Sequence, residues 1–189
     1  MSEEIKPNNE ELQSREAWNR WQEKRNRNRF AFLDWVKTTY NPQKVYYAGS
    51  GYDEVPKEVF GDKRVVHLSL EENKYGLPGG YFSRLKATNK VQGNIIDAPF
   101  KPKSFDAIYL HNVDIHSLVA ALDEFNQVLK DDGIHVFDND IWASEQIEYF
   151  ITAAQDVFVL ETIPENLISN ETDPTHYAEQ SFAIFKKKN

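Results

Sequence analysis

The chain has no cysteine among its 189 residues. A disulfide framework, a zinc site built on thiolates and a catalytic cysteine are therefore excluded. A long apolar run is also missing, and the first residues are acidic and polar where a signal peptide needs a basic start and an apolar stretch. From these absences we expect a cytoplasmic protein that does not enter a membrane.

Positive charge is scarce as well, since 22 Lys and Arg residues face 30 Asp and Glu residues and leave a net charge of -8. General binders of nucleic acid need a basic surface that displaces counterions from phosphates, so we do not expect a nucleic-acid partner. What is present is enough apolar material for a core, 40% of the residues, in a chain of 22.0 kDa. That size favours one domain with an appendage.

The appendage is the N-terminal segment. Residues 10–40 contain no Pro or Gly, which predicts one helix or two, ending at Asn41-Pro42. Apolar residues at helical spacing favour a helix that docks over a cleft or sheet edge as a lid. A basic stretch, Lys24 to Arg29, leaves an anionic-ligand surface open, and the aromatics also suit a protein partner or a second copy. We therefore divide the chain into an extension, 1–40, and a main domain, 41–189.

Strands and helices are expected to alternate in the main domain. Gln43 to Ala48 reads as a strand, followed by a Gly-x-Gly turn and a helix from Tyr52 to Phe60 in which Asp53 is the candidate N-cap. Ile115 to Lys130 reads as a second helix, with Gly133 in the left-handed cap position. The further strands are expected near residues 64–70, 90–93, 105–110, 134–137, 157–163 and 177–185. This order favours a parallel α/β sheet, whose ligand crevice lies beyond the carboxyl ends of the strands.

Four motifs resemble the middle of class I S-adenosylmethionine-dependent methyltransferases: Gly93 with Asn94, Asp97 to Phe100, Ser104 to Asp106, and Val128 to Gly133. The resemblance extends from about residue 44 to about residue 185. It implies a Rossmann-like, mostly parallel seven-stranded sheet with an antiparallel C-terminal hairpin. It also implies S-adenosylmethionine as the cofactor and an unidentified small-molecule or peptide acceptor.

The resemblance assigns the methionine end of the cofactor to the turn after the first strand. Gly49 and Gly51 match the family's glycine loop, but Tyr47 stands at its acidic position and Asp53 at its third glycine. The family's acidic residue orients the cofactor's amino group. Tyr47 offers one hydrogen bond but no charge, so Asp53 is a candidate replacement from the other side of the turn.

The adenosine end is assigned to the next two strands. Ser69 stands where the family has an acidic residue for the ribose hydroxyls, and Glu71, two residues on, projects to the same side of a strand. Asn94 replaces an Asp near the adenine amino group, for which its amide oxygen can accept the same hydrogen bond. Ile95 is expected to pack on the adenine ring.

His111 and Asn112 end the fourth expected strand, where the family has polar residues bordering the methyl-transfer site. His111 is the candidate general base because the ordinary pKa of histidine lies near neutrality. The alternative, a structural histidine, stays open. The run Asp138-Asn139-Asp140 suits either a hard divalent cation or a substrate amine, or Asp140 serves as a helix cap. We leave a metal unassigned.

Two functions remain open. The first is a methyltransferase that holds the methyl group in line with a nucleophile. The second is a degenerate, non-catalytic methyltransferase-like domain that acts as a binding or regulatory protein, because the departures at Tyr47, Asp53 and Ser69 cluster on cofactor positions.

Overall fold

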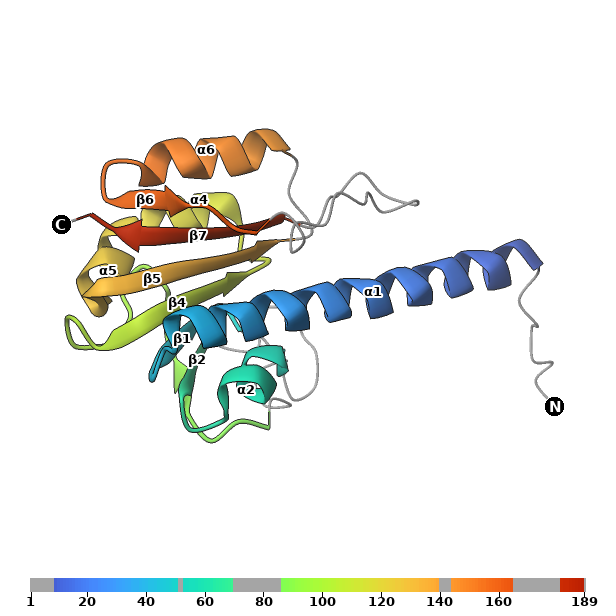
Figure 1. Ribbon diagram of the computed structural model, residues 1–189, viewed down its shortest axis with the longest axis horizontal. Helices are drawn as coiled ribbons and strands as arrows, with labels where there is room; N and C mark the ends of the chain where they lie inside the picture. The colour runs from blue at the N-terminus through green and yellow to red at the C-terminus, as the bar shows by residue number, and fades with distance from the viewer. Residues whose placement is uncertain (1–8, 51–52, 70–85, 140–143, 165–180, 189) are drawn as a thin grey trace.

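The computed structural model describes residues 9–50, 53–69, 86–139, 144–164 and 181–188. It shows a seven-stranded sheet with helices on both faces (Figure 1). The elements are α1 (Asn9–Tyr40), β1 (Val45–Ala48), α2 (Val55–Phe60), β2 (Val65–Ser69), β3 (Lys90–Gln92), β4 (Phe105–His111), α4 (Ile115–Ala120), α5 (Leu122–Val128), β5 (Leu129–Asn139), α6 (Ser144–Ala154), β6 (Phe158–Glu161) and β7 (Ser181–Lys187).

The sheet has the order β3-β2-β1-β4-β5-β7-β6. Strands β1 to β5 pair in parallel, and β7 runs antiparallel to both β5 and β6. This confirms the predicted Rossmann-like sheet with an antiparallel C-terminal end. The chain moves outward from β1 to β3 and then returns to β4 on the other side of β1. The carboxyl ends of β1 and β4 therefore form the topological switch point, where open α/β sheets bind ligands.

Both faces of the sheet are buried, as expected of parallel strands. Tyr46 and Ile108 face the cluster that includes residues of α4, α5 and α6. Their neighbours Tyr47 and Tyr109 face the other cluster, which includes residues of α1 and α2. Because side chains alternate along a strand, each central strand supplies both cores.

The N-terminal segment is one continuous helix of 32 residues, α1. Its buried residues are Arg29, Phe32, Leu33 and Val36, which recur at the i, i+3, i+4, i+7 spacing of one helical face. The ring of Phe32 stacks on Phe182 of β7 with centroids 4.3 Å apart. The helix thus shares a core with the sheet at its C-terminal end, while its N-terminal half extends past the sheet (Figure 1). No helix in the described ranges is both long and apolar enough to cross a membrane.

The prediction of one helix from Ile115 to Lys130, closed by Gly133, is wrong. Helices α4 and α5 meet at Ala121, and α5 ends at Val128 because Leu129 is extended, with φ -77° and ψ 138°. Gly133 lies inside β5 and has no positive φ. A Cβ there would lie 2.6 Å from Cγ of Leu129 and 3.1 Å from the carbonyl oxygen of Asp106. The glycine therefore permits close packing between strands and does not cap a helix.

Helix α2 begins later than predicted, at Val55, and its N-cap residue is Glu54. Pro56 lies in the first turn as expected. Asp53 accepts the N–H of Val55 through Oδ1, at 3.1 Å, and this leaves its other oxygen for contacts inside the fold. Asp53 therefore contacts the start of α2 with one oxygen only, and it is not the N-cap residue of that helix.

His135 is a buried polar residue in the middle of β5. Its ring lies between Phe125 and Phe158, at centroid distances of 5.3 Å and 4.3 Å. Neither ring nitrogen has a hydrogen-bond partner among the residues that the structure describes. Burial lowers the pKa of His135 to about 3. Because the unfolded chain binds this proton near pH 6.5, the stability due to neutral His135 is complete above that pH and is lost as the pH falls towards 3.

We predict that His135→Leu stabilises the protein, since an unpartnered buried polar group costs about 1–3 kcal/mol. The melting temperature should rise by several degrees at pH 7, and the gain should increase at pH 5. Thermal melts at both pH values measure this. The exposed His116→Leu is the matched control and should change neither value. An equal gain at both pH values would contradict the account.

Candidate functional site

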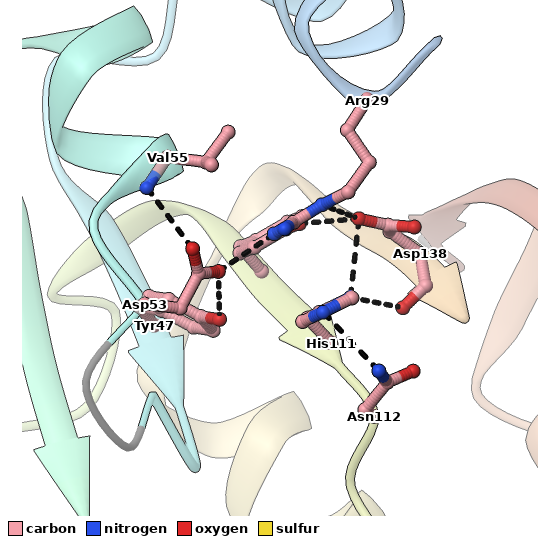
Figure 2. A network of polar contacts seen from close by, with 8 residues as sticks. Arg29, Tyr47, Asp53, Val55, His111, Asn112 and Asp138 are labelled. Carbon is pink, nitrogen blue, oxygen red and sulfur yellow. Dashed lines mark hydrogen bonds and ion pairs between the residues drawn. The ribbon is translucent and has the colours of Figure 1, made fainter. Parts of the chain in front are cut away.

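A buried network of polar side chains occupies the switch point, with Arg29 of α1 at its centre (Figure 2). The Arg29 Nε donates to Oδ2 of Asp138 at 2.6 Å, and its Nη2 donates to Oδ2 of Asp53, also at 2.6 Å. Arg29 is only 2% exposed and Asp138 is fully buried. One guanidinium therefore joins the loop after β1 to the end of β5.

Two tyrosines complete the network from the sheet. Tyr47 of β1 donates its hydroxyl hydrogen to Oδ2 of Asp53 at 2.5 Å. Tyr109 of β4 donates to Oδ2 of Asp138 at 2.6 Å and accepts from Nη2 of Arg29 at 2.7 Å. Burial and the neighbouring carboxylates raise the pKa of both phenols well above the ordinary value, so both act as neutral donors.

The two carboxylates are held in their charged form. Burial acts to raise the pKa of Asp138, but the charge of Arg29, the neighbouring His111 and the donated hydrogen bonds outweigh it and lower the pKa far below its usual range. The same balance of burial against Arg29 lowers the pKa of Asp53. One cation thus faces two anions, and the network has an excess of one negative charge. Asp53 is the accessible carboxylate, with 20% of its side chain exposed.

His111 and Asn112 lie beside this network at the end of β4. The His111 Nδ1 lies 3.2 Å from Oδ2 of Asp138 and 3.2 Å from the Asp138 carbonyl oxygen. Its Nε2 lies 3.2 Å from Nδ2 of Asn112. Asn112 has a φ of 51°, a left-handed conformation that Asn tolerates better than most residues.

The structure brings together only some of the residues predicted for the site. Tyr47, Asp53, His111 and Asn112 belong to one connected set of contacts (Figure 2). Gly49 directly follows β1. Its φ is 68°, and a Cβ would lie 2.8 Å from Cγ2 of Val113, the residue after Asn112. Gly51 and Glu71 lie outside the described residues.

The predicted adenosine positions lie farther along the same edge of the sheet. Ser69 ends β2, and its carbonyl oxygen accepts the N–H of Gly93. The Oδ1 of Asn94 accepts the N–H of Ile96 at 3.1 Å, which uses one lone pair and leaves the other for a ligand. Ile95 is 7% exposed and packs in the core cluster, whereas Ile96 is 44% exposed. The cofactor roles of Ser69, Asn94 and Ile95 stay predictions.

The acidic run at the end of β5 does not form a metal site in the described residues. Asp138 is fully buried and paired with Arg29, and no group of three or more His, Cys, Asp or Glu within the described ranges could hold a metal ion. Asp140, the candidate cap or ligand, lies outside those ranges.

Sequence reasoning missed Arg29 and Tyr109 as members of the site. Arg29 is the last residue of the basic stretch that suggested an anionic-ligand surface, but it is buried and satisfied by carboxylates. The position of Arg29 in the sequence was the signal that could have revealed its role. Arg29 is three residues before Phe32 and seven before Val36, on the apolar face of α1, where an arginine requires buried anionic partners.

The comparisons with known proteins agree with this topology. The family model described as a methyltransferase domain matches residues 48–137. The sterol 24-C-methyltransferase ERG6B of Gibberella zeae is 31% identical over 113 residues, which cover 51% of this chain and 30% of that protein. This chain therefore spans less than a third of that relative.

Solved structures share the whole architecture. The methyltransferase domain of bacterial CtHen1 has a TM-score of 0.61 at 15% identity, covering 86% of this chain and 98% of that one. A TehB-like SAM-dependent methyltransferase from Corynebacterium glutamicum has a TM-score of 0.57 at 17% identity, covering 93% and 100%. This chain has the class I S-adenosylmethionine-dependent methyltransferase fold.

We predict that Arg29→Ala destabilises this methyltransferase fold by about 3–5 kcal/mol at pH 7, because two buried carboxylates lose their shared cation. Asp53 and Asp138 have lowered pKa values, so their contribution to stability is complete above the ordinary pKa near 4 and is lost as the pH falls below it. The difference between the variant and the wild type should therefore shrink below pH 4. Urea unfolding at several pH values measures it.

Arg27→Ala is the matched control, because Arg27 lies two residues away on the same helix and is exposed. It should change the free energy of unfolding by less than about 0.5 kcal/mol. Equal effects of the two substitutions would show that Arg29 does not hold α1 against the sheet.

Proposed function

We propose that the protein is an S-adenosylmethionine-dependent methyltransferase that acts on a small-molecule or peptide acceptor. The observation that carries the proposal is the negatively charged network at the switch point between β1 and β4. Arg29 neutralises only one of the two carboxylates, Asp53 and Asp138, and 20% of the Asp53 side chain is exposed. A site with surplus negative charge favours a ligand that carries cationic groups.

The proposal assigns residues of this chain to each part of the cofactor. Asp53 would receive the amino group of its methionine part, beside Gly49, whose backbone admits no side chain. Ser69 and Asn94 would contact the ribose and the adenine, with Ile95 beneath. Gly51 and Glu71, which were predicted at the same site, would also contact the cofactor. When bound, S-adenosylmethionine supplies a methyl group on a positively charged sulfur.

The same network orients the acceptor side of the proposed site. His111 and Asn112 border the crevice at the end of β4, next to the carboxylates. His111 would accept a proton from the acceptor, and Asn112 would contact the cofactor beside it, as the resemblance predicts. The remaining catalytic effect would come from holding the reactants close and aligned.

One observation favours the alternative, a non-catalytic methyltransferase-like domain that binds or regulates. The carboxylate of Asp53 already accepts three hydrogen bonds, from Tyr47, Arg29 and the N–H of Val55. A carboxylate has about four acceptor positions, so one position remains for a ligand. Under this alternative the network serves only to fix α1 on the sheet.

Three finer predictions remain part of this proposal. They are a cytoplasmic location, the division into an extension, 1–40, and a main domain, 41–189, and a protein partner or second copy at the N-terminal helix. The extension of α1 past the sheet supports the last of these (Figure 1).

We predict that the protein binds S-adenosylmethionine and S-adenosylhomocysteine with micromolar affinity in calorimetric titrations. Asp53→Asn should weaken binding of both ligands at least tenfold, which corresponds to about 1.4 kcal/mol, because the amino group loses its anionic partner. Asp34→Asn removes an exposed carboxylate from α1 and is the matched control, with unchanged affinity. Thermal melts of both variants confirm that they are folded.

If millimolar ligand gives neither a heat of binding nor thermal stabilisation, the proposed methyltransferase function is refuted. The alternative, a non-catalytic binding domain, is then retained. If the protein binds tightly and Asp53→Asn leaves the affinity unchanged, the proposed methyltransferase function stands. The proposed role of Asp53 in the cofactor site is then wrong.

A further inference from the structure

We infer that Asp138 is a positioning residue that holds His111 as its Nδ1–H tautomer and so makes Nε2 the proton acceptor of the site. Two oxygens of Asp138, the carboxylate Oδ2 and the backbone carbonyl, lie 3.2 Å from Nδ1 of His111. Both are acceptors only, so the hydrogen between them and the ring must be on Nδ1.

The other ring nitrogen faces the opposite kind of group. The amide nitrogen Nδ2 of Asn112 lies 3.2 Å from Nε2 of His111. An amide nitrogen only donates, so Nε2 uses its lone pair and carries no hydrogen. Acceptors at one nitrogen and a donor at the other select the same tautomer of a neutral ring (Figure 2).

Asp138 is itself rigidly placed. Its side chain is fully buried, and Oδ2 accepts hydrogen bonds from Arg29 and from Tyr109, both at 2.6 Å. The pairing of β4 with β5 sets His111 opposite Asp138, which brings the carbonyl oxygen to the ring. Tyr109 also lies parallel to the His111 ring, with centroids 6.4 Å apart and 6° between the planes. Sheet register, an ion pair and a neighbouring ring therefore fix the orientation of His111.

The catalytic meaning of this arrangement rests on the proposed methyltransferase function. About 10% of the His111 side chain is exposed, whereas the Asp138 side chain is fully buried. A base of this kind suits a hydroxyl or amine acceptor, which loses a proton on methylation. With S-adenosylmethionine bound, the acceptor atom would form its bond to the methyl carbon as the carbon–sulfur bond breaks with its electron pair on sulfur. The acceptor's proton would move to Nε2 once the Asn112 amide has released that lone pair. The resulting imidazolium lies next to the charge of Asp138.

The test is heteronuclear NMR of protein labelled with ¹⁵N-histidine, without ligand, at about pH 8.5, well above the ordinary histidine pKa of about 6.5. His111→Gln assigns the His111 signals among those of the 5 histidines. We expect the Nδ1–H pattern for His111, whereas free neutral histidine favours the Nε2–H form. An Nε2–H pattern in the wild type would overturn the inference, whatever the variants do.

Asp138→Asn removes the charged acceptor and leaves the carbonyl. We expect the pattern to become a mixture of both tautomers, and a pure Nδ1–H pattern would show that the carboxylate does not position the ring. Asp106→Asn, at the opposite end of β4, is the control and should leave the His111 pattern unchanged. If Asp138→Asn does not fold, the wild-type pattern decides.

The NMR measurement is made without cofactor, so its outcome does not depend on whether the proposed function is correct. If the protein shows the Nδ1–H pattern but does not bind S-adenosylmethionine, the inference about the tautomer stands and the proposed methyltransferase function is refuted.

Discussion

The buried charge of Arg29 is the interaction on which the site depends. An arginine removed from water is tolerated only with anionic partners, and here the partners come from two distant parts of the chain, Asp53 after β1 and Asp138 at the end of β5. Satisfying that one guanidinium places α1 across the sheet and fixes both carboxylates beside the switch point. The tyrosines of β1 and β4 then have defined acceptors for their hydroxyl hydrogens. The same contacts therefore stabilise the fold and set the geometry of the proposed site.

The fold was largely predictable because it follows from local patterns. Strands rich in β-branched and aromatic residues, a Gly-x-Gly turn and an uninterrupted N-terminal segment indicated the parallel sheet and α1. The antiparallel C-terminal end was implied by the resemblance to methyltransferases. The error at Gly133 has a physical cause. A glycine after an apolar helix usually marks a left-handed cap, but this glycine is required by the close approach of Leu129 and Asp106, a contact between strands that no local pattern contains.

The site was predictable only in part. Polar residues at strand ends, such as His111, Asn112 and Asp138, were found because parallel strands place their carboxyl ends at one edge. Asp53 was also predicted as a replacement for the acidic residue missing at Tyr47. The structure shows the two side chains hydrogen-bonded to each other, and the cofactor role of Asp53 stays a prediction. The role of Arg29 was not found, because it depends on partners 24 and 109 residues away and on the angle at which α1 crosses the sheet.

The central claim is that this charged network forms the floor of a cofactor site. The most direct test is a crystal structure of the protein with S-adenosylhomocysteine. The account predicts the ligand at the carboxyl ends of β1 to β4, with its amino group within hydrogen-bond distance of Asp53, its adenine beside Asn94, and Arg29 still joining Asp53 to Asp138. A ligand bound elsewhere, or a crevice that stays without ligand at saturating concentration, would contradict it.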